Sequence, residues 1–274
     1  MKKIKNKLIV SDFDGTLLTS SQTIPDDVKS AINEYVACGG IFAVCTGRMI
    51  ASILPRVREL GLKGLVVGYE GTVIAEIESG KILKKDGMPF ERAAEVCEVI
   101  HAGGFGINTY SDEVLYTDIP KDNPYLMRYE KITGVPAVKV DGPMSEFIRK
   151  NKLVCQKVTS LVMPEDREKI YSVLLEKFGG SLDVTCSADV LVEVAPYNCN
   201  KGEAVKFLAD YYNVPLSSAV AIGDNLNDVS MIKVAGTGVA VGNAVEGLKS
   251  VADYVTVSNN DSAVAKIIEK FGFE

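Results

Sequence analysis

The segment of residues 8–18, Leu-Ile-Val-Ser-Asp-Phe-Asp-Gly-Thr-Leu-Leu, decides the predicted fold. Its apolar start lacks polar alternation, which is typical of a strand buried on both faces of a parallel sheet. Such sheets bind ligands beyond the carboxyl ends of their strands, and here that end carries Asp12 and Asp14. If the strand pleat continues, both carboxylates leave on the same side and repel each other unless a cation or a shared proton joins them. The segment therefore predicts a divalent metal site, with Gly15 allowing a sharp turn.

A strand-to-loop exit and a calcium-binding loop are two other interpretations of this segment. A polar exit from a strand into a loop would give the same isolated Asp-x-Asp-Gly pattern. A calcium-binding EF-hand loop would need helices on both sides and a Glu at its twelfth position. Counted from Asp12, that position is Thr23, and the preceding segment predicts a strand, so the EF-hand is set aside. The choice between a loop exit and a metal site depends on the other motifs.

Composition and charge narrow the class of protein. A chain of 274 residues predicts about two domains, and 47% hydrophobic residues suffice for sizeable cores. The net charge of −6 gives no electrostatic footprint for nucleic acid. The basic start has too few apolar residues for a signal peptide or a membrane span, so we expect a cytoplasmic protein without a membrane partner. Six scattered cysteines without a C-x-x-C pair predict buried thiols, and the single histidine, His101, excludes histidine dyads and zinc clusters.

The order of expected elements predicts an α/β fold with a doubly wound parallel sheet of Rossmann type. Apolar strands alternate with amphipathic helices over the first 68 residues, and the same alternation of strands and helices is found again near the end of the chain. A hairpin is expected between residues 72 and 84. Further strands of the sheet are expected at residues 41–45, 64–68, 219–222, 238–241 and 254–257.

The amino-acid composition changes between about residues 86 and 193, where Tyr, Pro and charged residues are more frequent. We expect an inserted α+β domain there, so that residues 1–85 and 194–274 form one discontinuous core. Inside the insertion, a helix is expected at Phe90–Ala102. Single long strands are expected at Lys152–Met163 and Leu182–Val194, and a loop-rich helical stretch at residues 120–150.

Four polar clusters stand at strand ends or at the start of a helix. Taken singly, each has an ordinary explanation, such as a helix cap, a turn or a solvated side chain. Lys201 differs because a lysine in the first turn of a helix opposes the macrodipole, which predicts an anionic group nearby. Together the clusters supply the carboxylates, hydroxyl, lysine and helix amino terminus that phosphoryl transfer uses. The clusters are Asp12 with Asp14, Thr46-Gly47-Arg48, Lys201, and Asp224 with Asn227 and Asp228.

These motifs resemble those of the Cof-type phosphatases of the haloacid dehalogenase superfamily. The resemblance rests on D-F-D-G-T-L-L, T-G-R, N-K-G and G-D-N-x-N-D, which follow one another in the family's order and spacing along the whole chain. It implies a Mg²⁺-dependent phosphomonoesterase that forms an aspartyl-phosphate and acts on small phosphorylated metabolites, sugar phosphates in particular. It also implies that the insertion is a cap domain that selects the substrate.

The resemblance further implies a role for each motif residue. Asp12 would be the nucleophile and Asp14 the general acid and base, with Asp12, Asp14 and Asp224 holding Mg²⁺. Asp228 would orient the site, and Arg48 would be a second positive anchor beside Lys201. The groups implied to bind phosphate oxygens are Thr46, Lys201, Asn227 and the backbone of Phe13 and Gly47. One departure is Glu70-Gly71, where the family commonly has Asn-Gly; it adds negative charge near the expected site rim.

Alternative functions were compared on the same residues. A phosphate-receiving signalling domain needs an aspartate after its third strand, where this chain has Gly68-Tyr69-Glu70. A sugar phosphomutase and a catalytically silent sugar-phosphate-binding regulator on the same fold both stay open. The sequence predicts neither the oligomeric state nor the exact substrate. The insertion residues that could contact a substrate are Tyr110, Tyr116, Arg128, Tyr129, Arg149, Lys152 and Lys157.

Overall fold

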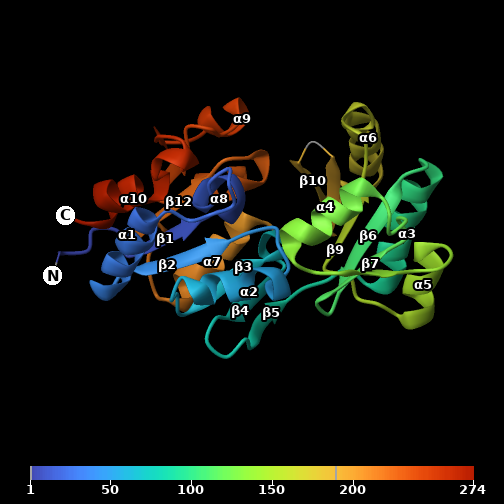
Figure 1. Ribbon diagram of the computed structural model, residues 1–274, viewed down its shortest axis with the longest axis horizontal. Helices are drawn as coiled ribbons and strands as arrows, with labels where there is room; N and C mark the ends of the chain where they lie inside the picture. Colours follow the sequence, from blue (N-terminus) through green and yellow to red (C-terminus); the bar gives the residue numbers. More distant parts are fainter. Residues whose placement is uncertain (1, 189) are drawn as a thin grey trace. The chain divides into compact units, whose positions relative to one another are not determined.

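The computed structural model describes residues 2–188 and 190–274, which form two compact units (Figure 1). We call Met1–Gly47, Leu54–Leu83 and Asn200–Glu274 the core unit, and Arg48–Ile53 with Lys84–Cys199 the inserted unit. Each unit has its own sheet. Over the described ranges, no helix is both long enough and apolar enough to cross a membrane.

The core unit is built on an eight-stranded sheet with the order β14-β13-β12-β1-β2-β3-β4-β5. Its strands from β14 to β3 are parallel, and β4 pairs antiparallel with β3. The strands are β1 Leu8–Ser11, β2 Ile41–Cys45, β3 Leu65–Gly68, β4 Val73–Glu76, β5 Ile82–Lys85, β12 Ala219–Gly223, β13 Thr237–Ala240 and β14 Tyr254–Val255.

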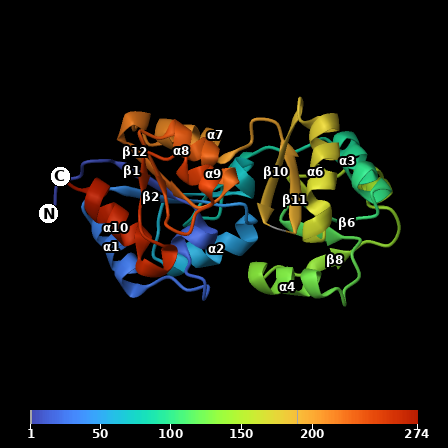
Figure 2. The same cartoon turned by 90° about the horizontal axis from the view of Figure 1, so that it is seen from above.

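Helices cover both faces of this sheet. Figure 2 shows α1 and α10 on one side of the central strands and α7 with α8 on the other. The chain therefore has the doubly wound parallel α/β fold that its sequence predicts. The helices that lie between or after these strands are α1 Asp26–Ala37, α2 Ile50–Glu59, α7 Lys201–Tyr211, α8 Val229–Val234, α9 Glu246–Lys249 and α10 Ala263–Ile267.

Burial and register explain where polar residues gather. All four residues of β1 are buried, as a strand covered on both faces requires. Ser11 pairs in register with Val44 of β2 and with Ile222 of β12. The three strands thus end at the same level, and the residues that follow them meet at one edge of the sheet.

The inserted unit contains a six-stranded sheet with the order β10-β11-β9-β6-β7-β8. Its strands are β6 Gly106–Ser111, β7 Val114–Thr117, β8 Ala137–Lys139, β9 Lys157–Leu161, β10 Leu182–Ala188 and β11 Leu191–Pro196. Its helices are α3 Phe90–Ala102, α4 Pro124–Thr133, α5 Met144–Asn151 and α6 Arg167–Phe178.

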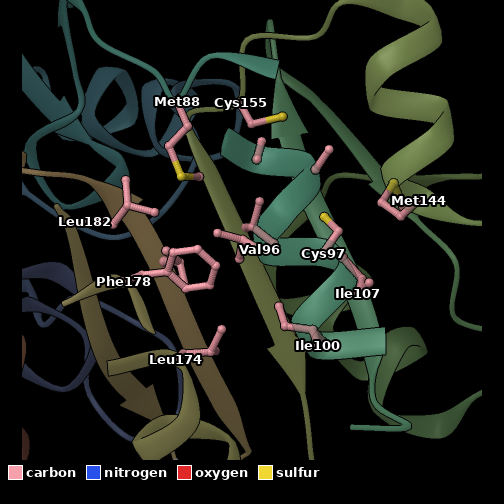
Figure 3. Close-up of a cluster of buried hydrophobic side chains, with 14 of the residues drawn as sticks. Met88, Val96, Cys97, Ile100, Ile107, Met144, Cys155, Leu174, Phe178 and Leu182 are labelled. Atoms are coloured by element: carbon pink, nitrogen blue, oxygen red, sulfur yellow. The ribbon is translucent and has the colours of Figure 1, made fainter. Parts of the chain in front are cut away.

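One face of that sheet packs on helices and carries the hydrophobic core of the inserted unit (Figure 3). The cluster contains Ile107 from β6, Val96 and Ile100 from α3, and Leu174 and Phe178 from α6. Because side chains alternate along a strand, the residues between these apolar positions lie on the opposite face. That opposite face is polar and includes Asn108, Lys157 and Glu193.

Three expectations for the insertion were wrong. The strand expected at Leu182–Val194 is two antiparallel strands, β10 and β11, which no Gly or Pro in that segment indicates in the sequence. The strand expected at Lys152–Met163 begins only at Lys157, since Lys152 has a left-handed backbone (φ 50°) at the end of α5. The expected helical stretch of residues 120–150 also contains β8, a short strand.

Candidate active site

The carboxyl edge of the core sheet positions the first aspartate. The Asp12 amide donates to the Ile222 carbonyl (2.9 Å), which ties the end of β1 to β12. Strand geometry stops there: Gly15 has φ +80°, and the Leu18 amide donates to the carbonyl of Phe13, five residues earlier, in a π-type turn. The strand pleat on which the expectation for Asp12 and Asp14 depended therefore does not continue to Asp14. Among the described residues, the acidic side chains close enough to share one metal ion here are those of Asp12, Asp224 and Asp228.

Lys201 is the centre of the site. Its Nζ lies 2.5 Å from Asp12 Oδ1 and 2.6 Å from Asp228 Oδ1, and the residue is only 1% exposed. It occupies the first turn of α7, where Asn200 caps the helix by accepting from the Glu203 amide. Burial alone would lower the pKa of Lys201, but the neighbouring carboxylates raise it well above its ordinary value. These carboxylates favour the charged form of Lys201 and are the anionic partners that its place in the helix predicts.

Asp228 is held rigidly by its surroundings. Its second oxygen, Oδ2, accepts from the Asp224 amide (2.8 Å) and the Asn225 amide (3.0 Å), and the residue is fully buried. Gly223 permits this arrangement, since a Cβ there would lie 2.5 Å from the Asp228 carboxylate. With both oxygens occupied, Asp228 orients Lys201 and the loop that carries Asp224.

The carboxylates of Asp12, Asp224 and Asp228 form an acidic group whose ligand atoms lie within 4.8 Å of one another. Burial raises the pKa of Asp12 well above its usual range; Lys201 opposes this rise, and Asp228 and Asp224 add to it. Burial, with Asp228, also raises the pKa of Asp224 to about 6. Thr16 donates to Asp224 Oδ1 (3.0 Å) and fixes that side chain. Hard oxygen donors with surplus negative charge fit Mg²⁺, which prefers carboxylate and water oxygens.

The loops after β2 and β3 complete this edge. The Thr46 amide donates to the Val67 carbonyl (3.0 Å), and the Thr46 carbonyl accepts from the Glu70 amide (3.0 Å). Asn227 Nδ2 donates to Glu70 Oε1 (3.0 Å). The structure thus brings together Asp12, Thr46, Gly47, Lys201, Asp224, Asn227 and Asp228 in the core unit, and it buries Glu70 among them instead of leaving it at a rim.

Comparison with known proteins identifies the family. The sequence model described as haloacid dehalogenase-like hydrolase matches residues 9–268. The phosphatase YwpJ of Bacillus subtilis is 30% identical, with 96% of this chain and 99% of that protein covered. The chain belongs to the haloacid dehalogenase-like hydrolase family. Like these relatives, it is a phosphatase.

Other relatives support the assignment of this phosphatase to the haloacid dehalogenase-like hydrolase family. A haloacid dehalogenase-like hydrolase from Bacteroides thetaiotaomicron has a similar structure, with a TM-score of 0.84, 28% identity and coverage of 97% of this chain and 99% of that one. A second Bacillus subtilis protein, 5-amino-6-(5-phospho-D-ribitylamino)uracil phosphatase YwtE, is 25% identical over 96% of this chain and 97% of its own length.

The sequence motifs did not identify Asn243 as a residue that supports the site of this phosphatase. Asn243 Nδ2 donates to the Gly15 carbonyl (2.8 Å), and its Oδ1 accepts from the Asn259 amide (2.9 Å). It therefore braces the turn that follows Asp12. Its position in the sequence could have indicated this role. Asn243 follows the end of β13 and therefore lies at the same edge of the sheet as the other site residues.

Arg48 and the insertion candidates lie in the inserted unit. Arg48 Nη1 donates to the Ile132 carbonyl (3.1 Å), so its expected role as a phosphate anchor stays a prediction. Arg149 pairs with Glu91 and Glu98 at the surface. Of the other candidates, Arg128 is exposed, Tyr116 packs on Phe147 and Lys152 ends α5.

The remaining candidates gather on the polar face of the inserted sheet. The Tyr110 and Tyr129 hydroxyls are 2.7 Å apart, and Lys157 Nζ pairs with Glu193 Oε1 at 2.7 Å. Register places Asn108 on the same face, and it is fully buried. Both side-chain polar atoms of Asn108 lack a hydrogen-bond partner among the described residues. This phosphatase therefore carries a second set of buried polar groups, formed mainly by neutral donors and acceptors with one ion pair.

Proposed function

We propose that this protein is a Mg²⁺-dependent phosphomonoesterase that acts through an aspartyl-phosphate. The observation that carries the proposal is the position of Lys201, which binds both Asp12 and Asp228 while Asp224 completes the acidic group. A buried lysine neutralises part of the charge, but three carboxylates exceed it. The site thus suits an additional cation and a reaction whose main requirement is charge neutralisation.

Asp12, Asp224 and the backbone carbonyl of Asp14 would hold the metal, and Asp228 would orient them. When bound, Mg²⁺ supplies positive charge beside the phosphoryl oxygens. An Asp12 carboxylate oxygen attacks phosphorus, the ester P–O bond breaks, and Asp14 donates a proton to the leaving oxygen. Asp14 then removes a proton from water, which attacks phosphorus, releases orthophosphate and restores Asp12.

The phosphate itself would be bound by Lys201, Thr46, Asn227 and the backbone of Phe13 and Gly47. Four of these residues follow the ends of strands, where backbone amides and short polar side chains are available to an anion. A set of this size suits a single phosphate. The net charge of −6 also disfavours long polyanions such as nucleic acids.

We further propose small, hydroxyl-rich phosphate esters as substrates, with sugar phosphates as the main class and the inserted unit as the selecting element. The buried polar face around Asn108 supports this, because an amide with a free donor and a free acceptor suits a hydroxylated ligand. The name of the relative YwtE, which describes a ribityl phosphate as its substrate, agrees with that chemistry.

The proposal is tested by a screen of phosphomonoesters for phosphate release by the purified protein with Mg²⁺. We expect hydrolysis of several hexose and pentose phosphates and weaker activity on small nucleotide or cofactor phosphates. Isomerised sugar phosphate in place of orthophosphate would indicate a phosphomutase, and tight sugar-phosphate binding without turnover would indicate a regulator. Much faster hydrolysis of phosphoproteins or of polynucleotide ends would contradict the small-substrate proposal.

A further inference from the structure

Glu70 has an unusual backbone that directs its side chain into the site. It follows β3 in a short turn, Tyr69–Gly71, with φ 59° and ψ 18°. Few residues other than glycine adopt this left-handed conformation, so local preference does not explain a glutamate here. The next residue, Gly71, approaches α7 so closely that a Cβ would lie 2.5 Å from the Asn200 carbonyl oxygen. Glu70 is thus fixed beside the start of α7 and is only 7% exposed.

The Glu70 carboxylate contacts groups proposed to bind phosphate. Oε1 accepts from Asn227 Nδ2 at 3.0 Å, and Oε2 lies 3.7 Å from Lys201 Nζ. Oε1 also lies so close to Gly47 that any Cβ at that position would overlap it. Asn227, Lys201 and Gly47 therefore surround a carboxylate where the proposed function needs them to surround a phosphate.

We infer that Glu70 is an internal competing anion for the phosphate site, which substrate must displace and which promotes release of orthophosphate. This inference rests on the proposed function. A carboxylate and a phosphate both need the same donors, and two anions at contact distance repel each other in a buried setting. Each cycle then ends with Glu70 returning to Asn227 and Lys201 as the product leaves. The result is weak product inhibition.

Two substitutions test this role through binding of inorganic phosphate. Glu70→Gln removes the charge while keeping the shape, and Glu70→Asn removes the charge and the reach while tolerating a left-handed backbone. Glu246→Gln is the matched control, because it removes a carboxylate that is 89% exposed in the same unit. Titration calorimetry gives the orthophosphate dissociation constant of the Mg²⁺-loaded protein, and a steady-state assay gives its inhibition constant.

We expect both Glu70 variants to bind orthophosphate about tenfold more tightly than wild type, because one close repulsive charge is gone. The inhibition constant should fall by the same factor, and Glu246→Gln should change neither value. Unchanged or weaker binding in both variants would overturn the inference, since Glu70 would then brace Asn227 and Lys201. Loss of the cooperative thermal transition in both variants would also overturn it, because a side chain that must leave cannot be required for folding.

The wild-type protein separates this inference from the function beneath it. If wild type hydrolyses phosphomonoesters while the Glu70 variants bind phosphate no better, only the inference on Glu70 fails. If wild type neither hydrolyses phosphomonoesters nor binds orthophosphate, the proposed function fails, and the inference fails with it.

Discussion

Two buried lysines in this phosphatase have opposite electrostatic settings. Lys201 in the core unit lies within 2.6 Å of both Asp12 and Asp228, with a further carboxylate at 3.7 Å. Lys157 in the inserted unit pairs with one carboxylate, that of Glu193, at 2.7 Å. Both lysine side chains are at most 3% exposed, so solvent screens neither site well. Counting the ion pairs of the described residues, the first site has more carboxylates than cations, and the second has one of each.

The number of carboxylates around each lysine distinguishes the proposed catalytic site at Lys201 from the charge-balanced pair at Lys157. A buried one-to-one ion pair needs no further partner, and its net contribution to stability is small because desolvation offsets the attraction. Surplus buried carboxylates are unfavourable until a cation arrives, which is why burial raises the pKa of both Asp12 and Asp224. The unbalanced site is thus arranged for binding and catalysis at a cost in stability.

The largest effect should follow removal of the metal. We expect a chelator to abolish phosphate release and added Mg²⁺ to restore it, because surplus carboxylates would otherwise repel an anionic substrate. Calcium should inhibit, since its looser shell of about six to eight ligands holds the carboxylates in other positions. Full activity in excess chelator, with metal analysis showing none bound, would refute the metal role.

The two lysines can be compared directly. Lys201→Met should lower kcat by about a thousandfold, as expected for loss of one preorganised group that stabilises developing charge. Lys157→Met, the matched control, should change kcat by less than about tenfold, because uniform binding contacts affect KM more than kcat. Steady-state kinetics on one sugar phosphate measures both. Equal losses of kcat would remove the distinction between the two sites.

The balanced pair should affect stability instead. Lys157→Met should lower the free energy of unfolding by about 3 to 5 kcal/mol, because it leaves the Glu193 charge buried and unpaired. Adding Glu193→Leu should recover most of this loss. Urea unfolding of the two variants and wild type measures the difference. A double variant as unstable as the single one would show that the pair contributes more than charge balance.

A smaller effect is expected at Asp224, where the folded-state pKa is raised from 3.8 to about 6. A raised carboxyl pKa stabilises the folded state fully below the unfolded pKa, and this contribution is lost as the pH rises through about 6. In metal-free protein at pH 7, Asp224→Asn should therefore raise the free energy of unfolding by about 3 kcal/mol, from about 1.4 kcal/mol per unit of pKa. The gain should vanish near pH 4. A less stable variant at pH 7 would contradict this account.

Much of the site could be predicted because strand ends in a parallel sheet share an edge. That rule alone places Asp12, Thr46 and Asp224 together. The rule does not predict the position of the Asp14 side chain. The strand ends at Ser11, and a turn determines where the side chains after it point. Nor does the rule predict that Glu70 turns inward, since a left-handed glutamate opposes local preference.

The inserted unit was predicted less well for a related reason. Some of its antiparallel strands follow one another with no Gly or Pro between them, as β10 and β11 do, so the sequence did not separate them. Its polar face is set by strand register, which sequence spacing shows only once the pairing is known. Tyr110, Tyr129 and Lys157 therefore stood among seven candidates until the structure separated them from Tyr116, which packs on Phe147, and from residues that are exposed or paired at the surface.

The central claim is that Asp12 carries the phosphoryl group during turnover. The most direct test is mass spectrometry of enzyme quenched during steady-state hydrolysis, with the modified peptide sequenced. We predict one added phosphoryl group on Asp12, more of it in Asp14→Asn, where dephosphorylation is slowed, and none in Asp12→Asn, whose turnover is lost. Phosphorylation at another residue, or an Asp12→Asn variant that keeps more than a small fraction of wild-type turnover, would contradict the account.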